Sequence, residues 1–100
     1  MVITVFRARV RPELQEEYVE WVARMRALAA KIPGFISHKG FRADDGERVS
    51  IVEFESEEAQ RAWRMHPEHV AAQIKGRKEF YEEYRIQVCV LQRESVYPKR

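Results

Sequence analysis

Residues 63–69, with the sequence W-R-M-H-P-E-H, hold the densest group of side chains that could do chemistry. On a helix, His66, His69 and Gln73 are three and four residues apart and therefore share one face. An imidazole can accept a proton, and the indole of Trp63 offers a flat apolar surface beside it. The spacing predicts a small-molecule pocket with His66 and His69 as candidate catalytic residues.

Further aromatic and polar residues extend this stripe or face it from elements earlier in the chain. The candidate substrate-binding residues are Trp63, Gln73, Arg77, Phe80, Trp21 and His38. The same pattern also fits an ordinary helix edge, in which His66 begins a helix before Pro67 and leaves its ring in solvent. On that alternative, Trp21 and Trp63 belong to the core.

Arg7 is a third candidate catalytic residue. It shares one face of the first predicted strand with Ile3 and Val5. If that face is turned toward the helices, Arg7 is a buried cation that needs an anionic ligand or a carboxylate such as Glu53. If the face is turned outward, Arg7 lies at an interface or at its rim.

Metal and cofactor motifs are weak in this chain. The i, i+3 spacing of His66 and His69, with His38 as a third ligand, permits a metal site, but the zincin pattern H-E-x-x-H does not occur. There is no glycine-rich phosphate loop. Cys89 lies in the middle of a predicted strand among aliphatic residues, which predicts a buried and unreactive thiol. We therefore expect neither a metal nor an organic cofactor.

The composition fits one folded domain over residues 1–100. Hydrophobic residues make up 45% of the chain and charged residues 34%, which excludes a disordered or membrane-spanning protein. A net charge of +2 with both signs mixed gives no basic patch for nucleic acid. The chain opens on M-V-I-T-V-F without a charged leader, which predicts a cytoplasmic protein. It contains no asparagine, so no mechanism here uses that side chain.

The hydrophobic periodicity predicts an α+β fold of the ferredoxin-like type, β-α-β-β-α-β, with a four-stranded antiparallel sheet and helices on one face. The expected elements are a strand at 2–10, a helix at 12–32, strands at 35–41 and 47–55, a short helix after Ser56, a second from Pro67 through Tyr81, and a strand at 85–93. Gly76 lies inside the last of these helices and weakens it.

The first and last strands are apolar on both faces, although helices can cover only one face of the sheet. Val2, Phe6 and Val10 alternate with Ile3 and Val5. The second face must then be buried against another surface, and the same face of a second copy is the simplest candidate. The sequence therefore predicts a homodimer.

The chain resembles the antibiotic biosynthesis monooxygenase family of dimeric α/β barrels, from the strand at Ile3 to Gln92. The segments that carry the resemblance are V-F-R-A-R-V-R-P (5–12), P-G-F (33–35), V-E-F-E-S-E-E-A (52–59), W-R-M-H-P-E-H (63–69) and G-R-K-E-F-Y-E-E-Y (76–84). The resemblance implies a homodimer with a cavity between sheet and helices in each subunit. Some members oxygenate quinols or anthrones with O2 and without metal or flavin.

The resemblance leaves the activity of this chain open between three alternatives. The first is a cofactor-independent monooxygenase acting on a small electron-rich aromatic, and the second is a non-catalytic homodimer that binds a small hydrophobic or aromatic ligand. The third is a haem-handling protein, because some relatives degrade haem with an Asn-Trp-His set. Trp63 matches that tryptophan, but Phe6 or Arg7 stands in place of the asparagine and Gln73 in place of the histidine.

Overall fold

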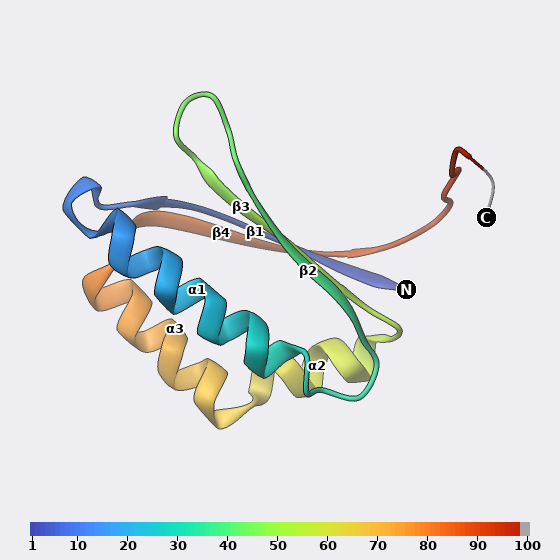
Figure 1. Ribbon diagram of the computed structural model, residues 1–100. Helices are drawn as coiled ribbons and strands as arrows, with labels where there is room; N and C mark the ends of the chain where they lie inside the picture. The colour runs from blue at the N-terminus through green and yellow to red at the C-terminus, as the bar shows by residue number, and fades with distance from the viewer. Residues whose placement is uncertain (99–100) are drawn as a thin grey trace.

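A computed structural model describes residues 1–98 (Figure 1). Its elements are β1 (Val2–Val10), a single 3₁₀ turn η1 (Pro12–Leu14), α1 (Gln15–Ala29), β2 (Phe35–Arg42), β3 (Arg48–Phe54), α2 (Glu57–Met65), α3 (Pro67–Glu79) and β4 (Tyr81–Val90). The strands form one antiparallel sheet in the order β2-β3-β1-β4. This arrangement confirms the predicted ferredoxin-like α+β fold.

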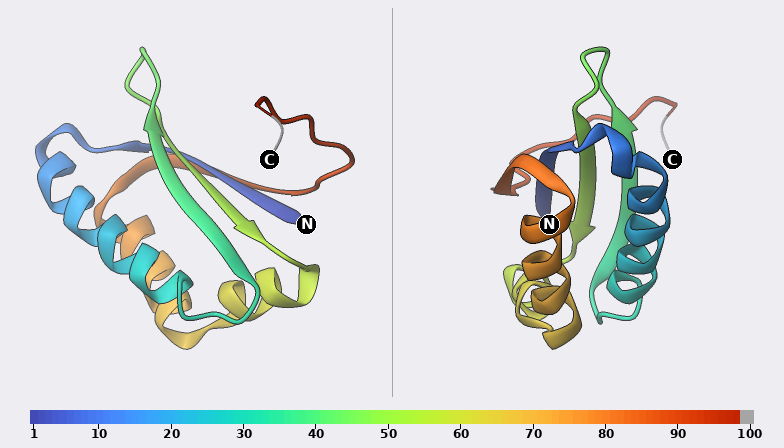
Figure 2. Two further views of the ribbon diagram at one scale, coloured as in Figure 1. Left: turned by 45° about the vertical axis from the view of Figure 1, so that its right-hand side comes forward. Right: turned by 90° about the vertical axis from the view of Figure 1, so that its left-hand side faces the viewer.

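The three helices all lie on one side of the sheet, as the two views in Figure 2 show. The sheet is open in the single chain and is not closed into a barrel. The even-numbered residues of β1 face the helices, and all of them except Phe6 are buried. Ile3 and Val5 face the other side and are half-buried. Helices therefore cover one face of the sheet and leave the other uncovered.

Local sequence signals fix where α2 and α3 begin. The hydroxyl of Ser56 accepts a hydrogen bond from the backbone N–H of Ala59 at 3.1 Å, so Ser56 caps α2. Nδ1 of His66 accepts a hydrogen bond from the N–H of Glu68 at 3.2 Å, and Pro67 occupies the first position of α3. A turn of extended backbone at His66 thus separates the two helices.

The sequence misplaced the start of the last strand. β4 begins at Tyr81, whereas the periodicity extended the helix through this residue and started the strand at Arg85. The pairing of Tyr81 with Val10 and of Tyr84 with Ala8 explains the early start. Both tyrosine rings then lie next to Phe6. The ring centroid of Phe6 is 5.4 Å from that of Tyr81 and 5.7 Å from that of Tyr84.

Gly76 does not interrupt α3. A Cβ atom at this position would lie 2.6 Å from Cε2 of Tyr81, which is too close for any side chain. The glycine is therefore required by the approach of the tyrosine ring to the helix, and this contact offsets its low helix propensity.

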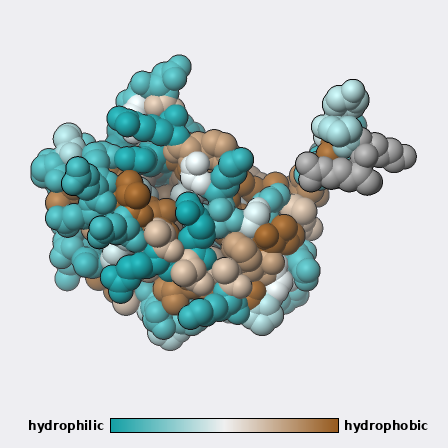
Figure 3. Space-filling view, in the orientation of Figure 1, coloured by the Kyte–Doolittle hydropathy of each residue, from teal (hydrophilic) through white to brown (hydrophobic). Residues whose placement is uncertain are grey.

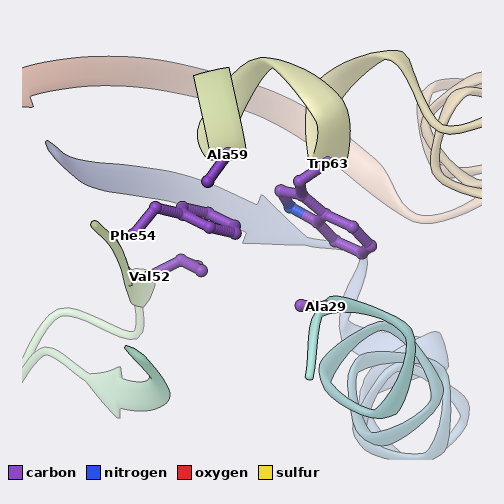
Figure 4. Packing of buried hydrophobic residues seen from close by; sticks show 5 residues of the cluster. All are labelled: Ala29, Val52, Phe54, Ala59 and Trp63. Carbon is purple, nitrogen blue, oxygen red and sulfur yellow. The ribbon is translucent and has the colours of Figure 1, made fainter. Parts of the chain in front are cut away.

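The buried core consists of two clusters. The first joins Ala29 of α1, Val52 and Phe54 of β3, and Ala59 and Trp63 of α2 (Figure 4). The second joins Val10, Tyr18 and Phe80 at the opposite end of the helices. Trp63 and Tyr18 each turn one side toward the space between the clusters, where a cavity lies.

The edge strand β4 is more exposed than its sequence suggested. Val88 and Val90 face the helix side of the sheet but are 46% and 72% exposed, because α3 does not extend over this edge. Cys89 faces the other side and is also exposed, so the prediction of a buried thiol is wrong for the single chain. Polar side chains cover most of the face seen in Figure 3, with apolar residues gathered near its centre.

Candidate functional site

A cavity of about 170 Å³ lies between the sheet and the three helices, and it is mainly apolar. Its lining residues are Thr4, Phe6, Tyr18, Trp21, Val22, Met25, His38, Ser50, Val52, Gln60, Trp63, Arg64, His69, Ala72, Gln73, Tyr81, Tyr84 and Ile86. This volume compares with a cavity of roughly 150 Å³ that binds benzene in another protein. The space is therefore suited to a small aromatic compound.

The sheet contributes three polar side chains to the cavity. Thr4 on β1 pairs with Val52 on β3, which pairs in turn with His38 on β2, so these residues form one row across the sheet. Ser50 lies two residues before Val52 and on the same face. The hydroxyls and the imidazole thus surround an apolar centre at Val52.

Aromatic rings from three elements enclose the opposite end of the cavity. The ring of Tyr81 lies 5.8 Å from that of Tyr18 and 5.4 Å from that of Phe6, and Trp21 contributes from α1. Burial raises the pKa of the Tyr18 and Tyr81 phenols, so both stay neutral at neutral pH. The rings provide flat apolar surfaces for a ligand.

His69 and Trp63 meet on the helix side of the cavity. Their ring centroids are 4.0 Å apart, with 30° between the planes. Nδ1 of His69 lies 3.5 Å from the carbonyl oxygen of Arg64, which can only accept, so the proton of the neutral ring sits on Nδ1 in this contact. Burial lowers the pKa of His69, which favours the neutral ring with Nε2 free to accept a proton.

His38 has a different role because its environment suppresses protonation more strongly. Burial, with a further contribution from the Arg26 guanidinium, lowers the pKa of His38 to about 4. Nδ1 of His38 accepts a hydrogen bond from Nε of Arg26 at 3.2 Å, which places the proton of the neutral ring on Nε2. At neutral pH His38 is therefore a hydrogen-bond donor and a very weak base.

Five of the nine candidate residues from the sequence line the cavity. They are His38, Trp63, His69, Gln73 and Trp21. Phe80 lies in the neighbouring core cluster, where its ring packs 5.2 Å from that of Trp21. A cavity thus lies beside these five residues. Along α3 its lining ends at Gln73, and Arg77 is exposed.

Two of the three candidate catalytic residues lie outside the cavity. Arg7 is on the uncovered face of the sheet, and its guanidinium binds the carboxylate of Glu47, with 3.1 Å between Nη2 and Oε1. Of the two orientations left open for Arg7, the structure has the outward one, since odd-numbered residues of β1 face away from the helices. His66 caps α3, as the alternative interpretation held.

Two polar residues that reach the cavity from the sheet and from α2 were not predicted from the sequence. Thr4 and Gln60 are 7% and 5% exposed, and both line the cavity. A signal for Thr4 was present, because it is the single polar member of the alternating set that includes Val2, Phe6 and Val10. No comparable signal marks Gln60, which lies in a helix with many polar residues.

The three histidines do not come together as a metal site. Within residues 1–98, no three His, Cys, Asp or Glu side chains lie close enough to hold an ion. No helix in the same part of the chain is long and apolar enough to cross a membrane.

Comparisons of the sequence with known proteins identify the family of this chain. A model of the antibiotic biosynthesis monooxygenase family matches residues 1–75. The uncharacterized protein YqjZ of Bacillus subtilis is 36% identical over 93 residues, which span 93% of this chain and 82% of YqjZ. This chain belongs to the antibiotic biosynthesis monooxygenase family.

Solved structures share the fold of this chain. SnoaB of Streptomyces nogalater, a cofactor-independent oxygenase, superimposes with a TM-score of 0.81 at 22% identity, over 98% of this chain and 97% of SnoaB. Rv0793 of Mycobacterium tuberculosis has a TM-score of 0.84 at 18% identity, over 95% of this chain and 98% of Rv0793. At these identities the likeness extends to the fold.

Phe6 or Arg7 stands where the resemblance places the asparagine of haem-degrading relatives, and the structure shows which of the two faces the cavity. Phe6 faces the cavity, whereas Arg7 faces away from it. Gln73 lines the cavity where the resemblance places a histidine. This member of the antibiotic biosynthesis monooxygenase family therefore presents an aromatic ring and an amide at these two positions.

Proposed function

We propose that this protein is a cofactor-independent monooxygenase that acts with O2 on a small electron-rich aromatic compound of the quinol or anthrone type. The observation that carries the proposal is the placement of His69 in an aromatic cavity. Its ring rests on Trp63, its Nδ1 is directed at the Arg64 carbonyl, and its Nε2 is available as a base. Family membership supports the same reaction class.

The chemistry requires little from the protein beyond a base and a dry pocket. His69 would remove a proton from the bound phenol or anthrone, and the resulting anion is rich enough in electrons to reduce O2. For an anthrone, a CH2 group and O2 give a carbonyl group and water, so one oxygen atom enters the product. The two hydrogen atoms of the CH2 group and the second oxygen atom form the water.

The cavity suits a neutral substrate that becomes an anion only on reaction. Among its lining residues, Arg64 is the one that carries a formal charge at neutral pH, since both histidines are neutral. Trp21, Tyr81 and Phe6 exclude water from the substrate ring. The amide of Gln73 and Nε2–H of His38 are available to hold substrate oxygen atoms.

A homodimer is part of the proposal. Ile3, Val5, Val49 and Ile51 form an apolar band on the sheet face opposite the helices, and no element of residues 1–98 covers them. Such a face is buried most simply against the same face of a second copy, because one patch then satisfies both chains. The unit that works in solution would be two chains of 100 residues.

Oxygen consumption tests the activity. An oxygen electrode records oxygen uptake with a panel of quinols and anthrones. Each compound is measured with and without the protein, and both solutions are first treated with a chelator. Protein-dependent uptake with a saturable rate is expected. If a ring compound binds in calorimetry but uptake equals the buffer rate, the protein is a binding protein and the oxygenase proposal fails. A Soret shift on titration with haem would instead support haem handling.

A further inference from the structure

The hydroxyl of Thr4 is a buried polar group without a protein partner. Thr4 is 7% exposed, and its Oγ1 is completely buried without a hydrogen bond. Within residues 1–98 no other side-chain nitrogen or oxygen atom is in this state. Native proteins pair nearly all buried polar groups, so this exception calls for a cause.

The surroundings explain why the protein itself offers no partner. On either side in the sheet, Thr4 has apolar cross-strand neighbours, Val52 and Val88. Ser50 pairs with Phe6 and His38 pairs with Val52, so the other two polar side chains of the sheet belong to neighbouring positions. Thr4 is nevertheless one of the residues that line the cavity.

We propose that Thr4 determines specificity by making a hydrogen bond to a hydroxyl or carbonyl oxygen on the aromatic ligand. This inference rests on the proposed function for the site and names the group that the ligand must carry. A threonine hydroxyl can both donate and accept, so it binds a phenol before reaction and the carbonyl oxygen that forms afterwards. A site with such a group rejects ligands that leave it unpaired.

The ligand class follows from the cavity. A volume of about 170 Å³ fits a small aromatic compound. Its flat faces would lie between the tyrosine and tryptophan rings, and its edge oxygen would point to β1. The class is therefore a neutral aromatic with an oxygen substituent, and purely hydrocarbon rings are disfavoured.

Two ligands of equal shape test the contact. p-Cresol and p-xylene differ by a hydroxyl in place of a methyl group. Isothermal titration calorimetry measures both with the full-length wild-type protein, with Thr4→Val, which keeps the shape but removes the hydroxyl, and with Thr4→Ser, which restores a hydroxyl. The comparison forms a double-mutant cycle, which cancels the different cost of removing each ligand from water.

The expected result is that the preference for p-cresol over p-xylene falls about 5-fold in Thr4→Val, as for one neutral hydrogen bond. Thr4→Ser should keep most of the preference. Thermal melting of Thr4→Val should occur at or above the wild-type temperature, because no protein hydrogen bond is lost. A purely structural threonine would move the melting temperature and leave the preference unchanged.

Several outcomes overturn the inference, and they differ from those that overturn the proposed function. An equal preference in wild type and Thr4→Val overturns the Thr4 contact and leaves ligand binding by the cavity intact. A lower melting temperature of Thr4→Val with unchanged preference assigns Thr4 to the core instead. If wild type binds neither compound, the Thr4 inference fails, and the oxygenase proposal is still decided by oxygen uptake with quinols and anthrones. Binding that depends on Thr4 without oxygen uptake overturns the oxygenase proposal alone.

Discussion

The imidazole of His69 packs against the indole of Trp63, with 4.0 Å between the ring centroids and 30° between the ring planes. The two residues come from different helices, α3 and α2, and the turn at His66 between the helices brings them together. The contact restricts the plane of the imidazole, and the Arg64 carbonyl oxygen lies 3.5 Å from its Nδ1. The base proposed for the reaction is thus held before substrate binds.

Replacement of His69 by glutamine should lower the rate of oxygen-dependent turnover by about 100-fold or more, because a positioned general base contributes that much. Substrate binding should change little, since glutamine fills similar space. His66→Asn is the matched control, because asparagine can still cap α3 while a nearby imidazole is removed. Equal losses in the two variants at pH 8 would count against His69 as the base.

The pH dependence should reflect the lowered pKa of His69. The neutral ring is the active form, so kcat/KM should rise with pH and reach a plateau after a midpoint below 6.5. His66 contributes to this lowering, so the midpoint should move upward in His66→Asn. Measurement of kcat/KM between pH 4.5 and 8 checks both points. If kcat/KM of His69→Gln falls at low pH with the same midpoint as in wild type, His69 is not the base.

Stability should fall in acid because of His38. Its pKa is about 4 in the folded protein, against an ordinary value of 6.5, so the unfolded chain binds the proton first. The stabilisation is complete above pH 6.5 and is lost as the pH falls toward 4, by on the order of 1 kcal/mol after solvent screening. The free energy of unfolding, measured in urea at pH 7.5 and 4.5, should therefore differ less between the two pH values in His38→Gln than in wild type. Identical changes would contradict this account.

The close approach of Tyr81 to α3 makes Gly76 irreplaceable. Gly76→Ala should destabilise the protein by about 1–3 kcal/mol, although alanine favours helices, because the new Cβ meets the ring at 2.6 Å. Ala71→Gly on the exposed side of the same helix measures how much the difference in helix propensity between alanine and glycine contributes by itself. A higher melting temperature for Gly76→Ala would show that the ring moves freely.

The uncovered sheet face predicts how dimerisation can be broken. Val5 pairs with Ile51 at the centre of this face, so Val5→Glu should convert a dimer into an 11.9 kDa monomer in light scattering. Val19→Glu on the exposed side of α1 is the control and should leave the mass unchanged. A wild-type mass of one chain at micromolar concentration would contradict the proposed dimer.

The sequence alone predicts the sheet and helices because alternating and helical hydrophobic patterns report which side of each element is buried. It does not predict the direction in which Arg7 points, because β1 is apolar on both faces and either face could meet the helices. It also misses the start of β4, since Tyr81 and Tyr84 take their place from contacts with Phe6 rather than from a local pattern.

The candidate site is predicted in part for a similar reason. His69 and Gln73 share a helix face, which spacing reveals, and both line the cavity. His66 and Arg77 follow the same spacing but lie at a cap and in solvent, because α3 begins only at Pro67 and is turned so that its cavity side ends at Gln73. The proposed role of Thr4 could not be recognised from the sequence, because only the structure shows that its buried hydroxyl has no hydrogen-bond partner.

The most direct test of the central claim is a reaction under ¹⁸O2 with chelator-treated protein and an anthrone or quinol that shows protein-dependent uptake. Mass spectrometry of product and solvent water then follows the label. The account predicts one labelled oxygen atom in the product and the other in water, with formation abolished in His69→Gln and retained in His66→Asn. Product without label, or turnover that returns only when a metal is added, would contradict it.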